Sequence, residues 1–421
     1  MSRSTIRPLH LNVSNASSAS LRYHPRAITP PFSLQRSLSS QAAVKKKQNR
    51  LPASYYRGGT SRAIFFQPKD LPPNRADWAP IFLGVLGSPD PNGRQLDGLG
   101  GGISSLSKIC VVGPSSREDA DVDYTFAAIG VKDNEVDYSS NCGNMTSAVG
   151  AFAVDSGLFD VDCPSGKEER DVTVRVHNTN TGKIIHSTFP VADGEAVADG
   201  DFAIDGVAGT AARVKLAFIS PAGSKTGKLL PTGNITDIID DVKATCIDAG
   251  NPCVFISSKS VGVDGRILPD EVEAHPTLLT QLDSIRRKAA VAMGISKDEA
   301  STPGSIPKIA MISPAKTYLT LSGETLQENE VDLVVRALSV GQPHRAVPIT
   351  VAMAIAAAAN VKGSVVNDVV SENRADTEGI TLGHSSGRIV VSAEFNDKGE
   401  LTQATVFRTA RRIMEGMVFW K

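Results

Sequence analysis

Two stretches of this chain would form helices that have no polar face. Residues 143–157 (GNMTSAVGAFAVDSG) and 345–360 (RAVPITVAMAIAAAAN) consist almost entirely of small and apolar residues. A helix that is apolar all round has to be buried on every side. Each is therefore expected to be the central helix of its own domain, with strands wrapped around it. The pattern predicts a pseudo-duplicated chain of two domains, of the α/β or α+β class, although no clear repeat of identity is visible between the halves.

The rest of the body alternates short apolar segments with glycine-rich turns. Apolar or alternating runs predict strands, because side chains on one face of a strand recur every second residue. Leucines, an isoleucine and alanines at helical spacing predict an amphipathic helix near residue 280. We expect strands at 63–66, 109–112, 123–126 and 172–176, a helix at 275–290, and a long loop at 221–233.

The composition is that of a soluble globular protein, with 41% hydrophobic and 21% charged residues in 421. The longest apolar run, 347–359, is well short of the ~20 residues that span a bilayer, so we expect no membrane-spanning helix. Five scattered cysteines form no CxxC pair, and the seven histidines include no HExxH. The sequence therefore predicts no disulfide framework and no metal site.

The charges are distributed unevenly along the chain. Residues 1–50 contain nine Lys or Arg and no acid, and subtracting them from the net −1 leaves −10 for the body. An acidic body with 5% aromatic residues disfavours a nucleic-acid partner. The basic, serine-rich segment 1–50 is typical of a mitochondrial transit peptide, and the alternative is a disordered tail without an address. We expect a mitochondrial protein, with a cytoplasmic location as the alternative.

The strongest chemical motif, SSNCGNM at 139–145, lies where the first apolar helix should begin. Backbone N–H groups and the positive end of the helix dipole point to this place. They would favour the thiolate form of Cys142, and they could also hold a substrate carboxylate. The alternative is that Asn141 is an ordinary N-cap beside a buried, inert cysteine.

Two glycine-rich loops are the next candidates. GLGGGISSLSK at 98–108 matches neither GxxxxGK[ST] nor GxGxxG, and it leads into an apolar strand. It is either a flexible loop with a surface lysine or a loop close to a ligand, with Lys108 turned into a cleft as a general base. RGGTSR at 57–62 suits a carboxylate site but could be a simple turn. NTNT at 178–181 and GHSSG at 383–387 are weaker candidates, and either could be only a turn.

Taken together, these motifs resemble the PrpF / methylitaconate Δ-isomerase family, which belongs to the wider diaminopimelate-epimerase-like fold. The matching stretches follow one another from about residue 55 to the C-terminus. They are RGGTSR (57–62), LDGLGGGISSLSK (96–108), NCGNM (141–145), HNTNT (177–181), PAGSKTGKLLPTG (221–233), DAGNPCVFI (248–256), GHSSGR (383–388) and RTARRIMEG (408–416).

The resemblance implies an α+β fold of two pseudo-symmetric domains, each with strands around a central apolar helix, and an active site in the cleft between them. With the family's last strand returning to the first domain, the domains would be 51–195 plus 402–421 and 196–401, after a disordered segment 1–50. The family's catalytic Lys/Cys pair maps onto Lys108 and Cys142, with no cofactor. The substrate-binding candidates are Arg57, Thr60, Ser61, Ser105, Asn144, Met145, Thr179, Ser385, Ser386 and Gly387.

The resemblance implies an isomerase that moves or re-forms the C=C bond of a small unsaturated di- or tricarboxylate of the 2-methylaconitate, aconitate or methylitaconate type. Epimerases of this fold use two cysteines, but the second apolar helix follows QPHR at 342–345, without a cysteine. This favours a Lys/Cys isomerase over an amino-acid epimerase or racemase. The other alternative is an auxiliary partner of an aconitase-like methylcitrate dehydratase. A homodimer and such a dehydratase stay open as partners.

Overall fold

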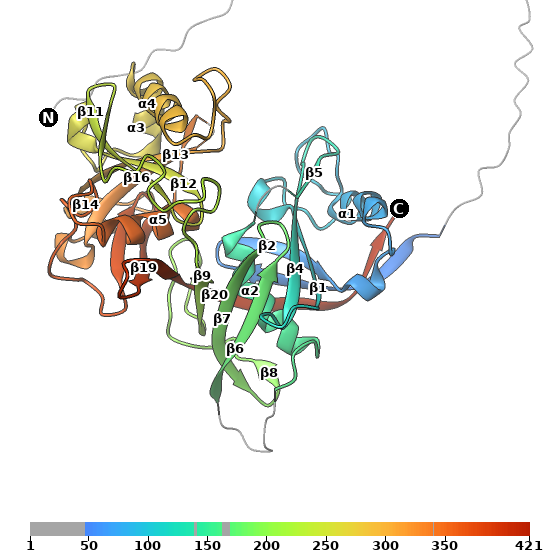
Figure 1. Cartoon of the computed structure of the whole chain (residues 1–421). Helices are drawn as coiled ribbons and strands as arrows, with labels where there is room; N and C mark the ends of the chain where they lie inside the picture. The colour runs from blue at the N-terminus through green and yellow to red at the C-terminus, as the bar shows by residue number, and fades with distance from the viewer. Residues whose placement is uncertain (1–46, 139–140, 162–168, 340) are drawn as a thin grey trace, which may run out of the picture. The chain divides into compact units, whose positions relative to one another are not determined.

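The two apolar helices are the centres around which the strands are arranged. The computed structural model describes residues 47–138, 141–161, 169–339 and 341–421. Within them, α2 (Gly143–Asp155) and α5 (Ile349–Ala359) occupy the two apolar stretches (Figure 1). Every residue at 145–154 and at 351–359 is buried. The prediction of two central, buried helices is confirmed.

The strands fall into two consecutive groups, which we call the first half and the second half. Those of the first half are β1 (Asn49–Gly58), β2 (Ser61–Phe66), β3 (Lys108–Pro114), β4 (Val122–Ile129), β5 (Val136–Asp137), β6 (Arg170–Asn178), β7 (Lys183–Ala192), β8 (Glu195–Ala196) and β9 (Arg213–Ile219). Those of the second half are β10 (Asp237–Ile239), β11 (Val242–Asp248), β12 (Pro252–Ser257), β13 (Lys308–Pro314), β14 (Tyr318–Leu319), β15 (Thr325–Leu326), β16 (Leu333–Ser339), β17 (Gln342–Pro343), β18 (Ile380–His384) and β19 (Gly387–Phe395). The last strand is β20 (Leu401–Trp420).

The two halves repeat one order of strand pairing. In the first half β1–β2 is antiparallel, β2–β3 parallel, β3–β4 antiparallel, β4–β6 parallel and β6–β7 antiparallel. In the second half the same sequence runs through β11–β12, β12–β13, β13–β16, β16–β18 and β18–β19. Each central helix follows a short strand, β5 or β17, that returns along β4 or β16. The α+β fold of two pseudo-symmetric halves is therefore confirmed.

Strand β20 connects the halves. Its first part pairs with β19 and β9, and its last part pairs with β1. Strand β9 also pairs with β7, so its neighbours include the first half, although the boundary at 195/196 assigns it to the second domain. The domain boundaries stay a prediction.

The remaining helices cover the outer faces of the strands. They are α1 (Trp78–Leu86), α3 (Pro269–Ala274) and α4 (Leu278–Ala292). The predicted strands at 63–66, 109–112, 123–126 and 172–176 lie within β2, β3, β4 and β6, and the helix predicted at 275–290 is α4. The sequence analysis missed α1, whose apolar side packs in a separate core cluster over the outer faces of β2 and β3.

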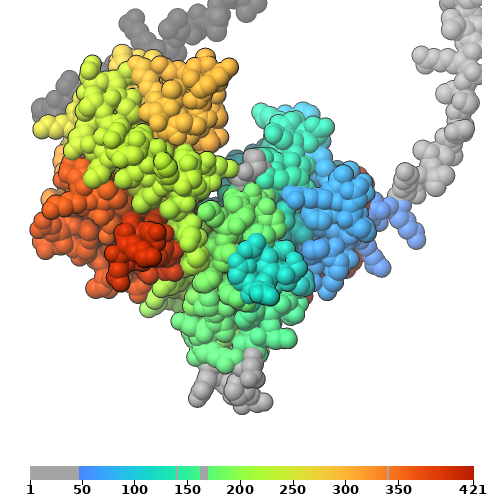
Figure 2. Space-filling view, viewed as in Figure 1, coloured from blue at the N-terminus to red at the C-terminus, as the bar shows by residue number. Residues whose placement is uncertain are grey.

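The loop predicted at 221–233 contains no regular element, and most of it is exposed or half-exposed. It lies in the yellow-green part of the surface in Figure 2. None of the helices in the described ranges combines the length and the apolar character needed to cross a bilayer. Most of the predicted transit peptide, residues 1–46, lies outside the described residues.

Candidate active site

Strand β3 turns Lys108 toward α2. Side chains alternate across a strand, so Lys108 and Cys110 share one face of β3 while Ile109 lies on the other. Cys110 is buried in the core cluster that contains Met145 of α2, whereas Ile109 packs in the cluster around α1. Lys108 is half-buried at the first position of β3, and its Nζ lies 5.1 Å from the centroid of the Phe126 ring. The ammonium therefore lies on the α2 side of the sheet.

Cys142 is the N-cap residue of α2. Its backbone is extended, and its carbonyl accepts the first helical hydrogen bond from the N–H of Thr146, at 3.0 Å. Its thiol makes no capping hydrogen bond and is half-buried. The first N–H groups of a helix have no partner within the helix, and the dipole makes this end positive. The thiol thus lies at the positive end of the helix, where a bound carboxylate would be stabilised.

Lys108 and Cys142 both lie near the buried Cys110. Burial is the main cause that raises the pKa of Cys110 well above its usual range, the nearby Cys142 raises it further, and the Lys108 ammonium lowers it. Coulomb interactions weaken with distance, so groups that shift the pKa of Cys110 have to lie near it. After burial and the charge of Cys110, Cys142 also raises the pKa of the buried Tyr124. Because Cys110 is fully buried and stays a thiol, Cys142 is the accessible sulfur of this group.

The turn between β1 and β2 packs against the first turn of α2. A Cβ added at Gly58 would lie 2.5 Å from the carbonyl oxygen of Asn144, and Gly59 has a φ of +51°. Only glycine fits such a contact and such a backbone. The Asn144 amide donates to Oγ1 of Thr60, at 3.1 Å. The glycines of the RGGTSR motif therefore bring the Thr60 hydroxyl to the start of α2.

A cavity of about 160 Å³ lies where α2 and α5 begin. Gly143 and Ile349 both line it, and a Cβ added at Gly143 would lie 2.9 Å from Cδ1 of Ile349. The positive ends of two helices therefore face one space, which favours an anion. Its polar lining consists of Asn141, Asn180, Thr181, Lys183, Ser224, Lys225 and Thr350.

Asn180 connects this cavity with Lys108. Its side chain accepts a hydrogen bond from the N–H of Phe126 at 2.8 Å and donates to the carbonyl of Phe126 at 2.9 Å. It also donates to the carbonyl of Tyr138, at 2.8 Å. The Lys108 ammonium lies over the Phe126 ring, and Asn180 belongs to the cavity wall. Phe126 is therefore the residue that connects the two.

The 221–233 loop is held at the cavity by a buried carboxylate. Asp248 accepts hydrogen bonds from the hydroxyl of Ser224 at 2.5 Å and from the N–H groups of Lys225 at 2.8 Å and Thr226 at 2.9 Å. Asp248 is fully buried in β11. These bonds fix Ser224 and Lys225 in the cavity lining, so the loop forms part of the cavity wall.

The second half carries a lysine that corresponds to Lys108. Strand β3 reads KICVVGP and β13 reads KIAMISP, and burial runs alike along both, from a half-buried lysine to an exposed proline. The Lys308 ammonium donates to Oγ1 of Thr350 in the first turn of α5, at 3.2 Å. Burial lowers the pKa of Lys308. The N-caps differ, because α5 has Pro348 where α2 has Cys142.

None of the predicted catalytic and substrate-binding residues is in the lining of this cavity, although chain neighbours of Cys142 and Thr179 are. The Ser386 hydroxyl donates to the carbonyl of Arg345 at 2.9 Å, and Gly387 accepts from the Tyr318 hydroxyl at 3.0 Å. Ser385 is fully buried, and its hydroxyl has no hydrogen-bond partner among the described residues. This loop therefore contacts the segment before α5 rather than the cavity.

The other predicted residues lie around the first half of the site. The Arg57 guanidinium is bound to the carbonyl and hydroxyl of Thr409, at 3.0 and 2.8 Å. Thr179 is exposed and shares a 2.6 Å hydrogen bond with Thr125. The remaining positions are half-buried or buried: Ser105 in a short 3-10 turn, Ser61 in β2 and Met145 in α2.

The sequence analysis did not assign Asn180, Lys183, Lys225, Lys308 or Thr350. Asn180 lies within the NTNT motif, so a signal for it was present. For Lys308 the signal is the shared pattern K-I-x-x-x-x-P in the two strands, which begin 200 residues apart.

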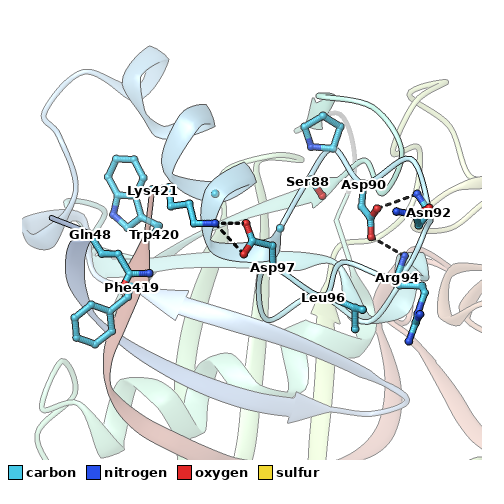
Figure 3. Close-up of a pocket in the computed structure, with 13 residues that line it drawn as sticks. Gln48, Ser88, Asp90, Asn92, Arg94, Leu96, Asp97, Phe419, Trp420 and Lys421 are labelled. Carbon is cyan, nitrogen blue, oxygen red and sulfur yellow. Dashed lines mark hydrogen bonds and ion pairs between the residues drawn. The ribbon is translucent and has the colours of Figure 1, made fainter. Parts of the chain in front are cut away.

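A larger cavity, of about 640 Å³, lies elsewhere, between the segment after α1 and the C-terminus. Figure 3 shows two of its charged groups with partners: the Lys421 ammonium lies 2.8 Å from Asp97, and Asp90 accepts from the backbone N–H groups of Asn92 and Arg94. None of the predicted site residues lines either cavity. We place the candidate site at the smaller one because its wall includes Asn141 and Gly143, the neighbours of Cys142, where the central helices begin.

Fold and site together define an α+β protein of two similarly built halves with a cavity at the starts of its central helices. The model of the PrpF protein family matches residues 48–421, and the chain belongs to this family. It is 40% identical to a 2-methyl-aconitate isomerase of Shewanella oneidensis and 38% identical to a 3-methylitaconate isomerase of Eubacterium barkeri. In each case 88% of this chain and 97% of the relative are covered.

A solved structure, the crystal structure of a methylitaconate-delta-isomerase, superposes with a TM-score of 0.81 at 37% identity. The match covers 89% of this chain and 96% of that chain. The likeness therefore extends through both halves, and it confirms the family resemblance of the sequence motifs.

Proposed function

We propose that this protein is an isomerase that moves or re-forms the C=C bond of a small unsaturated di- or tricarboxylate of the 2-methylaconitate, aconitate or methylitaconate type. Relatives named for such isomerisations match it along nearly their whole length. The observation that carries the proposal is the cavity at which two helix N-termini meet, with two lysines in its lining and with Asn141 and Gly143, the neighbours of Cys142, in its wall.

The proposed reaction moves only protons. One group of the Lys108/Cys142 pair removes a proton from an sp³ carbon that lies next to the carboxylate-bearing double bond. The electron pair of that C–H bond spreads over the allylic system and onto the carboxylate. The other group, or the same one, then returns a proton to a different carbon of the system. The double bond has moved, or it re-forms with the other geometry after rotation about the former double bond.

The site is suited to stabilising the delocalised anion. Such a proton is weakly acidic, and general acid–base catalysis contributes about 10²–10⁴-fold, so charge stabilisation has to lower most of the barrier. The first residues of α2 and α5 and the two lysines Lys183 and Lys225 line the cavity in which we expect that charge to develop. Asn144 and Thr60, bonded to each other at the start of α2, are candidate donors to one carboxylate.

The test follows isomerisation and proton exchange together. Purified protein is incubated in D₂O with a panel of unsaturated di- and tricarboxylates, and NMR detects new alkene isomers and incorporated deuterium. We expect both with at least one acid. Cys142→Ser and Lys108→Ala should each lose at least about 10²-fold in rate, the lower range for an acid–base group. The matched control Lys215→Ala, at an exposed lysine of β9, should keep the wild-type rate.

Two outcomes would overturn the proposal. Deuterium at an amino-acid α-carbon, with no acid of the panel isomerised, would make the protein an epimerase or racemase. An inactive protein that binds an aconitase-like dehydratase would be an auxiliary partner. A Cys142→Ser or Lys108→Ala variant that keeps most of the wild-type rate would leave the isomerase standing but refute the assigned pair.

We also propose a mitochondrial location. The family match begins at residue 48, so the basic, acid-free segment lies outside the part of the chain shared with the family. Residues 1–50 fused to a fluorescent protein should direct it to mitochondria. A diffuse cytoplasmic signal would favour the alternative of a tail without an address.

The proposed partners beyond the substrate are a second copy of the chain and an aconitase-like dehydratase of the same pathway. Light scattering of the purified protein would show a dimer by its mass, and a monomer would refute the first. Co-purification with the dehydratase would support the second, and failure to co-purify would refute it.

A further inference from the structure

We propose that Lys308 positions the substrate by polarising the Thr350 hydroxyl, which binds a second substrate carboxylate at the start of α5. This inference rests on the proposed function and names a residue that serves it from the second half. Lys308 would be a positioning residue, because it acts through Thr350 rather than on the reacting carbons. Its counterpart in the first half, Lys108, belongs to the proposed proton-transfer pair.

The equivalence of the two lysines comes from the fold. Lys108 is the first residue of β3, and Lys308 is the first residue of β13. Strand β3 pairs in parallel with β2 and antiparallel with β4, and β13 pairs in the same way with β12 and β16. Each lysine is half-buried and is followed by five buried residues. The strand therefore brings each ammonium toward the start of its own central helix. The two helix starts then meet at one cavity.

Lys308 carries a charge that no carboxylate in the described part of the chain neutralises. Its hydrogen-bond partner is the neutral hydroxyl of Thr350. Its other polar neighbours are Cys253, the register partner on β12, and His344, before α5. Burial raises the pKa of Cys253 to about 12, and burial together with Lys308 lowers that of His344 to about 4. Both are therefore neutral near pH 7, and a buried, uncompensated cation is costly unless an anion arrives.

Thr350 connects the Lys308 ammonium with the cavity. Its Oγ1 accepts from the ammonium, which leaves the hydroxyl proton free to be donated elsewhere. A hydroxyl that accepts a charged hydrogen bond becomes a stronger donor. Thr350 lines the cavity, in the first turn of α5 where backbone N–H groups are also free. Together they suit one more carboxylate, and the absence of a thiol at Pro348 fits a binding role rather than proton transfer.

The test separates binding from chemistry. Lys308→Met removes the charge at similar length, Lys308→Arg restores it, and Thr350→Val removes the hydroxyl at similar volume. With the best unsaturated acid of the panel, we expect Lys308→Met and Thr350→Val to raise KM about tenfold or more with kcat changed by less than about threefold. Lys308→Arg should recover much of the lost affinity. Lys215→Met is the matched control and should change neither constant.

A second measurement does not depend on turnover. Propane-1,2,3-tricarboxylate, which has no double bond, is titrated calorimetrically into wild type and variants, and melting temperatures are recorded without ligand. We expect weaker binding of this acid by Lys308→Met and Thr350→Val, with an equal or higher melting temperature for Lys308→Met. Unchanged KM and unchanged binding in both variants would overturn this inference while wild-type activity stands. A wild type that isomerises no acid would instead refute the proposed function.

Discussion

The two halves of the molecule share a strand order and a lysine but differ at the start of the central helix. In the first half the N-cap of the central helix is Cys142; in the second it is Pro348, and Lys308 donates to Thr350 two residues further on. Proline offers no group that could exchange a proton. In the function we propose, both halves therefore bind the anion, while chemistry that needs a thiol is confined to one. The predictions below test this division of roles.

The largest effect should come from exchanging the two lysines one at a time for methionine. We expect Lys108→Met to lower kcat by at least about 10²-fold, because it would remove an acid–base group. Lys308→Met should instead act mainly on KM. Steady-state kinetics on the same substrate, with circular dichroism to check the fold, distinguishes the two. Similar kinetic profiles for the two variants would show that the halves do not have separate roles.

The next effect concerns the thiols. Of the four cysteines in the described part of the chain, Cys142 is half-buried and the other three, Cys110, Cys246 and Cys253, are buried. Burial raises the pKa of each of the three, so they remain protonated near pH 7. Iodoacetamide should therefore modify Cys142 before them, and propane-1,2,3-tricarboxylate should slow the reaction. Peptide mass spectrometry measures both. Faster modification of Cys253 would reverse the comparison.

A smaller effect should appear in the pH dependence of binding. Burial lowers the pKa of Lys308, so its ammonium is present at low pH and is lost as pH rises, before an ordinary lysine loses its proton. Cys253 and His344, which face it, do not titrate between pH 7 and 9.5. The affinity of wild type for the saturated tricarboxylate should thus fall toward that of Lys308→Met as pH rises. A constant ratio between the two across this range would contradict the assigned role.

The smallest expected effect lies at the far end of α2. The Tyr56 hydroxyl donates to Asp155 at 2.6 Å, and burial is the main cause that raises the pKa of Asp155. Asp155 also accepts from the N–H of Ala196, at 2.9 Å. Tyr56→Phe should lower the free energy of unfolding by about 1–3 kcal/mol with little change in kcat. Denaturant unfolding measures the first. A large loss of kcat would mean that the position of α2 at the site depends on this end.

The sequence alone was sufficient for the features that follow from local patterns. Two helices without a polar face, at 143–157 and 345–360, have to be buried, and this requirement predicted the duplicated fold. The SSNCGNM motif at 139–145 predicted the start of the helix at 143–157; α2 does begin at Gly143, and its N-cap is Cys142 rather than Asn141. The family resemblance added the pairing of Cys142 with Lys108, which no local pattern contains and which stays a prediction.

Other features depend on contacts between segments far apart in the chain. The repeat of Lys108 and Lys308 becomes visible once the two strands occupy equivalent places, since few other positions of those strands are identical. Lys225 reaches the cavity because Asp248, in another segment, holds its loop. The GHSSGR motif suggested a binding loop, but its contacts with Tyr318 and Arg345 arise from packing that short motifs do not encode.

The most direct test of the account is the position of a bound polyacid. A crystal structure of Cys142→Ser with propane-1,2,3-tricarboxylate should show one carboxylate at the start of α2 and another on Thr350 at the start of α5. The Lys108 ammonium and the hydroxyl that replaces the Cys142 thiol should then lie on either side of one carbon of the ligand. A ligand bound instead in the larger cavity near Asp97 and Lys421, or an ammonium directed away from the bound acid, would contradict the account.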